Sequence, residues 1–280
     1  MIFALITVSV IILAFALYLI IGHNNNLKRV EYVFESDKIS REITFVHLGD
    51  LHGTEYGRDN ETLLKMISEQ KPDALLMTGD MLDEVINLSI DLSFLKKISA
   101  LYPIYAVAGN HEEKEIERSF TEIKSLYREH GVILLEDSSI TVDIKGEKIN
   151  ICGVDIPKGN VDPLPEAIDW TMKGINKDNY TIMLFHRPDP WRLFCGRDID
   201  LMLSGHTHGG HWIVPGLING IFAPEQGLFP RYAGGLYRFD DGMFLEVTRG
   251  LSLRSTFIPR AFNRPELVVL KLIPKKEDRK

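Results

Sequence analysis

Five short clusters of Asp, Asn and His residues could do chemistry in this chain, and each directly follows an apolar run typical of a buried strand. They are Asp50-Leu51-His52, Gly79-Asp80-Met81-Leu82-Asp83, Gly109-Asn110-His111-Glu112, His186, and Gly205-His206-Thr207-His208-Gly209-Gly210. Five of the nine histidines fall in these clusters. A sheet edge that gathered them would combine three aspartate carboxylates, one amide and five imidazoles.

Taken singly, each cluster has an ordinary explanation. An Asp after a strand, such as Asp50, is usually a turn former or a helix cap. A single His, such as His186, is more often a satisfied structural residue. Taken together they are different, because burying so many polar groups without a metal or another partner is very costly. Carboxylate oxygens and imidazoles without thiolates suit manganese, iron, zinc or magnesium, so the sequence predicts a metal centre.

The elements that must position these clusters are short apolar runs that alternate with amphipathic stretches. Strands are expected at residues 43–48, 74–77, 104–108, 182–185 and 201–203, and helices at residues 61–70, 94–101 and 113–130. This alternation indicates an α/β domain with at least one largely parallel sheet. Ligand sites in such sheets form at the carboxyl ends of the strands, which is where the clusters lie.

The middle and the end of the domain predict antiparallel pairing. Residues 139–144 and 148–154 flank a Lys145-Gly146 turn, and residues 236–239 and 243–247 flank Asp240-Asp241-Gly242, so both pairs are expected to be hairpins. A last strand is expected at residues 266–273.

The composition limits the classes of partner. The chain has 280 residues, 45% of them hydrophobic, which is enough for one substantial core or at most two modest ones. A formal net charge of -7 argues against nucleic acid as the main partner, because binding its backbone needs clustered Lys and Arg. The two cysteines form no CxxC pair, so a cysteine zinc site is not expected.

The N-terminal segment differs from the rest. Residues 2–21 carry no charge and are long enough to span a bilayer as a helix. No basic residue precedes the run and no A-x-A pattern follows it, which favours an uncleaved anchor over a cleaved signal peptide. The expected organisation is an anchor over residues 1–22, a linker leading into the domain over residues 23–42, and the domain over residues 43–275.

Flanking charges give the expected orientation. The nearest basic residues, Lys28, Arg29, Lys38 and Arg41, all follow the apolar segment. By the positive-inside rule, the chain is expected to be a single-pass protein of the cell membrane with its domain in the cytoplasm. An extracytoplasmic domain is the alternative, because a helix with few flanking charges can insert either way.

The five clusters, in this order, resemble the motifs of the calcineurin-like metallophosphoesterase superfamily over nearly the whole domain. Other segments resemble a bacterial membrane-anchored branch: His186-Arg187-Pro188-Asp189, Thr248-Arg249-Gly250-Leu251, Pro259-Arg260 and Asn263-Arg264-Pro265-Glu266. The resemblance implies a four-layer α/β/β/α sandwich. It also implies two divalent metal ions (manganese, iron or zinc, with manganese the first choice in vitro).

The resemblance implies a role for each matching residue. One metal would be held by Asp50, His52, Asp80 and His208, and the other by Asp80, Asn110, His186 and His206. Asp80 would bridge the two metals, and a hydroxide shared between them would attack phosphorus in line with the leaving oxygen.

Two residues of the motifs would act beside the metals. His111 would donate a proton to the leaving oxygen, as an imidazole can do. Asp83 would hold His111 in the right tautomer and orientation, and the alternative for Asp83 is a helix cap.

Two positions depart from related patterns. Glu84 follows Asp83 where protein serine/threonine phosphatases carry an Arg, which disfavours that class. His211 stands where the branch usually has a Gln, and we expect it at the surface or beside the ligands, not as a ligand. Arg187 and Arg260 are candidate phosphate contacts because Arg offers a planar donor fork, and a surface ion pair is the alternative for each.

The substrate is the part of the function that the sequence specifies least. Residues 212–237 are rich in aromatic residues, Gly and Pro, and could cover the site and bind an apolar substrate, or could be a core-packing excursion. With the membrane anchor, a lipid-linked phosphoester is expected, such as the UDP-diacylglucosamine that resembling enzymes cleave in lipid A synthesis. The alternatives are a nucleotide or cyclic-nucleotide phosphodiesterase, an enzyme exported from the cell, and a non-catalytic metal-binding scaffold.

Overall fold

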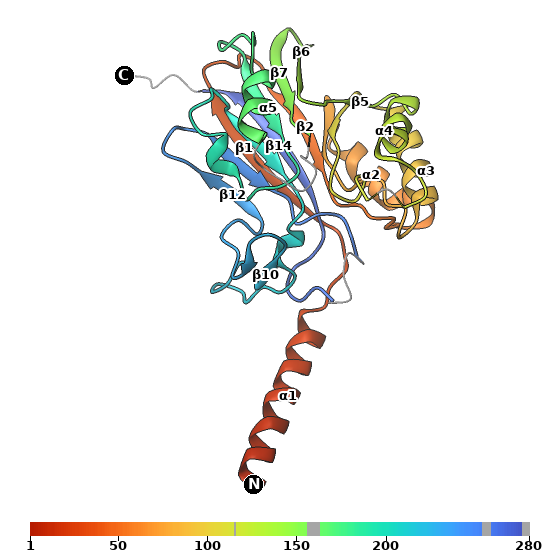
Figure 1. Ribbon diagram of the computed structural model, residues 1–280, viewed down its shortest axis with the longest axis vertical. Helices are drawn as coiled ribbons and strands as arrows, with labels where there is room; N and C mark the ends of the chain where they lie inside the picture. The colour runs from red at the N-terminus through yellow and green to blue at the C-terminus, as the bar shows by residue number, and fades with distance from the viewer. Residues whose placement is uncertain (115, 156–162, 254–258, 276–280) are drawn as a thin grey trace.

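Two six-stranded sheets dominate the computed structural model, which describes residues 1–114, 116–155, 163–253 and 259–275 (Figure 1). The first sheet contains β1 (Lys28–Ser36), β2 (Ile43–Leu48), β3 (Ala74–Thr78), β4 (Ile104–Val107), β5 (Ile133–Leu134) and β14 (Glu266–Pro274). The second contains β6 (Ser138–Ile144), β7 (Glu147–Gly153), β8 (Tyr180–Leu184), β9 (Leu201–Ser204), β12 (Gly235–Arg238) and β13 (Phe244–Val247). The strand orders are β1-β14-β2-β3-β4-β5 and β12-β13-β9-β8-β7-β6.

Helices and short segments complete the chain. The helices are α1 (Ile2–Gly22), α2 (Glu61–Glu69), α3 (Leu88–Ser99), α4 (Phe120–Glu129) and α5 (Leu164–Thr171). The 3-10 turns are η1 (Arg58–Asn60), η2 (Trp191–Leu193) and η3 (His208–Gly210). A small separate ladder pairs β10 (Phe222–Ala223) with β11 (Gly227–Leu228) in antiparallel fashion.

Three apolar clusters define four layers. In the first, Leu63 of α2 and Phe94 of α3 pack with Val46 of β2, on the outer face of the first sheet. The second lies between the two sheets, where Phe45, the neighbour of Val46 in β2, meets residues of β7, β8 and β9. In the third, Ile168 of α5 packs on the outer face of the second sheet. The expected α/β/β/α sandwich is therefore confirmed.

Most expected elements are present. The β2-β3-β4-β5 ladder is parallel, and both predicted hairpins, β6–β7 and β12–β13, are antiparallel. The helix predicted at residues 113–130 is shorter, since α4 begins at Phe120. Ser119 and Glu122 form a reciprocal capping box there, which satisfies the first free N–H groups of the helix and fixes its start.

Residues 28–36 belong to the stretch expected to lead into the domain. They form β1, which pairs in parallel with β14 over its whole length. The sequence did not predict this strand, because β1 is an edge strand and its exposed positions carry charged residues such as Arg29 and Glu31. Charged residues on an edge strand discourage pairing with other chains.

Helix α1 extends away from the domain at one end (Figure 1). Within the described residues, it contains the one helical window, Leu5–Gly22, that is long and apolar enough to cross a membrane, and a signal sequence shares these properties. The carboxyl ends of β2, β3, β4, β8 and β9 lead into the five predicted clusters.

Candidate metal centre

The structure brings all five clusters together. Three groups of side chains have ligand atoms within 4.8 Å of one another. They are Asp50 with His52 and His208, His52 with Asp80 and His111, and Asp80 with His186 and His206. The first and third groups correspond to the two predicted metal sites. Asp80 belongs to both the second and the third group and therefore links them.

Asp80 lies at the middle of the cluster. Its Oδ2 atom is 3.3 Å from His52 Nε2 and 3.4 Å from His186 Nε2. Its Oδ1 atom accepts the backbone N–H of His111 at 2.8 Å. One carboxylate therefore faces imidazoles from both predicted sites, which is the position that a bridging ligand requires.

Asn110 adjoins the second predicted site. Its side-chain oxygen is 3.0 Å from His186 Nε2 and 2.8 Å from His206 Nδ1. The two imidazole nitrogens are themselves 3.1 Å apart. Three ligand atoms thus converge on one point beside Asp80.

Outer hydrogen bonds fix which nitrogen of each ring faces the cluster. The Nδ1 atom of His186 donates to the carbonyl oxygen of Thr78 at 2.6 Å, which leaves Nε2 as the inward lone pair. His206 is turned the other way, because its Nε2 atom contacts the Glu225 carboxylate and its Nδ1 atom faces inward. Partners of this kind set the tautomer and orientation of metal-binding histidines.

Asp83 is shared by two rings. Its Oδ2 atom lies 2.7 Å from His111 Nδ1 and 2.7 Å from His52 Nδ1. A carboxylate can only accept, so both Nδ1 atoms carry hydrogen and both Nε2 atoms are directed elsewhere. The Nε2 atom of His111 lies 2.7 Å from Lys114 Nζ, on the exposed side of the ring. The predicted pairing of Asp83 with His111 is present, and the contact of Asp83 with His52 was not foreseen.

The site has a strongly anionic interior. Burial opposes charge on the His52 ring, but the carboxylates of Asp80 and Asp83 outweigh it and raise the pKa of His52 to about 10. Burial also opposes charge on Asp80, yet His186 and His52 hold its pKa well below the usual range. Burial raises the pKa of Asp50. These carboxylates need positive charge beside them.

The backbone around the cluster is strained. Asp50, His52, Asp80, His206 and His208 all have positive φ angles, between 47° and 69°. Residues other than Gly seldom adopt this left-handed conformation, and such strain clusters at functional sites.

Gly205 allows the closest approach of two clusters. A Cβ atom at this position would lie 2.4 Å from Asp50 Oδ2. That carboxylate accepts the backbone N–H of His206 at 2.9 and 3.1 Å. The glycine is therefore required for the loop after β9 to reach Asp50.

The residues present fit divalent metal ions. His52 Nε2 and His208 Nδ1 are buried and have no hydrogen-bond partner among the described residues. Unpartnered buried nitrogens are rare and costly, and a cation would satisfy them together with the surrounding carboxylate oxygens. The oxygen and imidazole donors suit manganese, iron or zinc.

The remaining predicted residues lie around this centre. The guanidinium of Arg260 is 5% exposed, and none of its three nitrogens has a hydrogen-bond partner within the described parts of the chain. Burial lowers the pKa of Arg260 to about 10. Arg187, by contrast, is held by both carboxylate oxygens of Asp189, at 3.2 and 3.0 Å.

His211 occupies one of the two positions expected for it, beside the ligands and not at the surface. Its side chain is 3% exposed and lies between His208 and Phe222, with ring centroids 6.1 and 6.3 Å away. Burial, and to a lesser degree the Arg260 charge, lowers the pKa of His211 to about 4. It therefore packs beside a predicted ligand.

Two important carboxylates were missed. Glu112 is buried and accepts the backbone N–H groups of Asp80, Met81, Leu82 and Gly109 at 2.8–3.0 Å. It thereby ties the loop after β3 to the loop after β4. Its position in the third cluster could have identified it as a residue of the site. No sequence pattern identifies Glu225, which contacts His206, because it lies 19 residues further along in an aromatic-rich loop.

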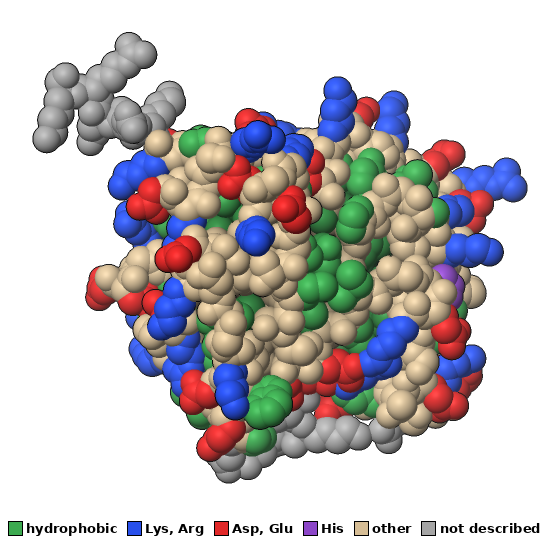
Figure 2. Space-filling model, turned by 90° about the horizontal axis from the view of Figure 1, so that it is seen from above, with side chains coloured by type: hydrophobic (Ala, Val, Ile, Leu, Met, Phe, Trp, Pro, Cys, Tyr) green, Lys and Arg blue, Asp and Glu red, His purple; other side chains and the backbone are tan. Residues whose placement is uncertain are grey.

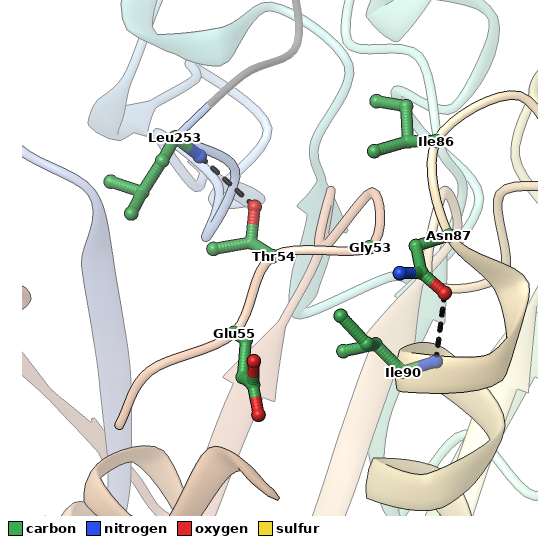
Figure 3. A pocket seen from close by; sticks show the side chains of 7 residues that line it. All are labelled: Gly53, Thr54, Glu55, Ile86, Asn87, Ile90 and Leu253. Atoms are coloured by element: carbon green, nitrogen blue, oxygen red, sulfur yellow. Dashed lines mark hydrogen bonds between the residues drawn. The ribbon is translucent and has the colours of Figure 1, made fainter. Parts of the chain in front are cut away.

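A pocket adjoins the loop that follows the first cluster (Figure 3). It has a volume of about 290 Å³ and begins at Gly53, the residue after His52. Its other lining residues are Thr54, Glu55, Ile86, Asn87, Ile90 and Leu253. Among the described residues that line it, Ile86, Ile90 and Leu253 form an apolar wall, Glu55 is acidic, and none is Lys or Arg. This part of the lining suits an uncharged or apolar part of a ligand better than a further phosphate.

Comparisons with known proteins identify a related family. Residues 43–210 match the family described as calcineurin-like phosphoesterase. The uncharacterized metallophosphoesterase YkoQ of Bacillus subtilis is 31% identical over 182 residues, which cover 62% of this chain and 65% of YkoQ. The chain thus spans less than two thirds of that relative.

Two further relatives match longer parts of the chain. The uncharacterized metallophosphoesterase YkuE of Bacillus subtilis is 28% identical, with 81% of this chain and 78% of YkuE covered. The phosphodiesterase YaeI of Escherichia coli is 29% identical, with 73% of this chain and 72% of YaeI covered.

Proposed function

Because this chain belongs to the calcineurin-like phosphoesterase family, we propose that it is a dinuclear-metal phosphodiesterase or pyrophosphatase. The observation that carries the proposal is the position of Asp80 between the imidazoles of both predicted sites. One metal would be held by Asp50, His52, Asp80 and His208, and the other by Asp80, Asn110, His186 and His206. Two bound divalent ions would supply an activated water and neutralise the phosphoryl charge.

The protein's own groups would do the rest. His111 Nε2 would give a proton to the leaving oxygen, while Asp83 accepts from Nδ1 and stabilises the positive ring. Glu225 would keep the Nδ1 atom of His206 turned inward. The pocket at Gly53 would take the part of the substrate that is not phosphoryl, which favours a diester over a free phosphate.

Metal removal gives the test of this proposal. The full chain in detergent is expected to hydrolyse ethyl p-nitrophenyl phosphate with added manganese, and to stop when a chelator removes the metal. Elemental analysis should find about two metal ions per chain. Restoring manganese should restore turnover. If neither bound metal nor turnover is found with manganese, iron or zinc, the hydrolase proposal is wrong and the chain is a scaffold that holds no metal. Bound metal without turnover of this ester or of lipid pyrophosphates would leave the metal-binding scaffold.

Arg260 is proposed as a phosphoryl contact. Its guanidinium lies buried near Asp50 and His208 without a hydrogen-bond partner among the described residues. Arg260→Ala is expected to lower kcat/KM about 10- to 100-fold, because hydrogen bonds to charged groups contribute roughly 1.5–3 kcal/mol. Arg260→Lys should recover part of this loss but not the bidentate contact.

Thermal unfolding separates this role from a structural one. An unpartnered buried charge costs stability, so Arg260→Ala should not lower the Tm of the metal-free protein. A clear fall in Tm with unchanged kcat/KM would contradict the proposal. Arg187 serves as the comparison, since its guanidinium is already occupied by Asp189.

We also propose that α1 is a single-pass anchor in the cell membrane with the domain in the cytoplasm. Lys28, Arg29, Lys38 and Arg41 on its C-terminal side support this orientation. In that setting the substrate would be lipid-linked, and UDP-diacylglucosamine is one candidate. Protease treatment of intact spheroplasts should leave the domain whole, and cleavage there would place it outside.

A further inference from the structure

The last turns of α1 pack against the loop that follows the metal motifs. The ring of Phe15 meets Trp212 edge-on at a centroid distance of 5.2 Å, and Tyr18 meets Phe262 at 5.3 Å. The hydroxyl of Tyr18 donates to the carbonyl oxygen of Ile213 at 2.8 Å. Trp212 is only two residues from Gly210, the end of the fifth cluster.

These contacts lie within the apolar window and not beyond it. At 1.5 Å per residue, Phe15 is about 10 Å below Gly22 along the helix. The backbone N–H of Phe262 donates to the carbonyl oxygen of Gly22 at 2.7 Å, which docks the helix end on the domain. If α1 spans a bilayer, Trp212 and Phe262 therefore lie beside its last two turns, at the depth where aromatic side chains collect.

Exposed apolar side chains surround this junction. Phe262 is 37% exposed, and the loop over residues 212–229 adds Leu217, Phe222, Leu228 and Phe229, which are 80%, 43%, 69% and 64% exposed. We call these five residues the apolar collar. In Figure 1 the lobe labelled β10 lies at the end of the domain from which α1 leaves.

The charge distribution distinguishes this end from the opposite one. Residues 212–229 contain a single charged side chain, Glu225, and His206 accounts for it. The face turned away from α1 has acidic and basic side chains over much of its area, around a strip of apolar ones (Figure 2). An exposed apolar group without charges is unusual on a surface that meets water.

We infer that the apolar collar rests in the boundary between headgroups and acyl chains of the bilayer that α1 spans. The β10–β11 hairpin links this contact to the centre, because its turn holds Glu225 against His206 while its second arm exposes Leu228. The metal centre therefore takes phosphoesters of amphiphiles from the same bilayer. The substrate class rests on the proposed hydrolase function, and the membrane contact rests on the proposed anchor role of α1 together with the contacts between α1 and the domain.

Fluorescence quenching tests the membrane contact. A tryptophan placed at Leu228 in the full chain should lose most of its added emission when vesicles of phosphatidylcholine brominated on the acyl chains replace unbrominated ones. The matched control is Leu101→Trp, since Leu101 is 59% exposed and precedes β4 at the end of the sheet away from Asn110. Equal quenching at both positions, or none at Leu228, would overturn the inference.

Kinetics test the consequence for substrate. The double variant Leu228→Asp/Phe229→Asp should lose roughly tenfold or more in kcat/KM for hexadecyl p-nitrophenyl phosphate in vesicles, because two apolar side chains no longer insert. Hydrolysis of soluble ethyl p-nitrophenyl phosphate should change less than twofold. Equal losses on both substrates would overturn the amphiphile assignment.

The two proposals fail separately. If the wild-type chain hydrolyses neither ester with any metal, the hydrolase function falls, while quenching at Leu228 still decides the membrane contact. If the soluble ester is hydrolysed and Leu228→Trp is not quenched, the function stands and the collar does not insert.

Discussion

Asp80→Ala is expected to reduce turnover on the order of 10³-fold or more, since a two-metal clamp supplies several kcal/mol of transition-state stabilisation. The variant should also hold fewer than two metal ions. Asp80 Oδ2 faces His52 and His186 at 3.3 and 3.4 Å, so its loss removes the carboxylate that contacts both of these rings. The measurement is metal content by elemental analysis beside kcat for ethyl p-nitrophenyl phosphate.

The control for this variant is Asp169→Ala. Asp169 has a 67% exposed side chain and pairs with Arg197 at the surface, so its removal should leave metal content and kcat unchanged. Asp80→Asn should resemble Asp80→Ala in turnover, because an amide cannot supply the negative charge. An Asp80→Ala protein that keeps two metals and normal kcat would exclude the bridging assignment.

His111→Ala should keep both metal ions and slow turnover by about 10²- to 10⁴-fold when the leaving group is an alkoxide. With p-nitrophenolate, which leaves without a proton, the loss should be much smaller. His111 occupies one of the three groups with ligand spacing, so metal content distinguishes a proton donor from a ligand. Loss of metal in His111→Ala would contradict the proton-donor assignment.

Asp83→Asn extends the same test. The carboxylate holds His52 as well as His111, both at 2.7 Å, so this variant should weaken metal binding in addition to slowing turnover. His130→Ala is the matched control, because His130 lies at the end of α4 and its ring contacts only the carbonyl oxygen of Leu126 among the hydrogen bonds of the described residues.

The sequence predicted the strands and clusters because that information is local. An apolar run followed by Asp50 or Asn110 shows both the strand and the end at which a polar group appears. The parallel arrangement then brings these ends to one edge, so the gathering of the clusters could be anticipated without knowing the distances. The division of their residues between two metals was implied only by the family resemblance.

Long-range partners could not be predicted in this way. His47 has no motif around it, yet its Nδ1 atom lies 2.5 Å from Glu246 and its Nε2 atom 2.7 Å from Thr78. Glu246 is 199 residues away and belongs to the other sheet. Glu225 is hidden in the same way, because only the folding of its loop places it on His206. The left-handed backbone at Asp50 and Asp80 is likewise a product of the assembled site.

The docking of α1 has a consequence for how reaction rates would be described. Residues 23–27 are the whole connection between α1 and β1, and Phe262 holds the helix end on the domain. A catalyst fixed to its anchor in this way searches for an amphiphile in two dimensions. Turnover would then follow the mole fraction of substrate among the lipids, and adding inert lipid would slow it although the amount of substrate per litre stayed the same.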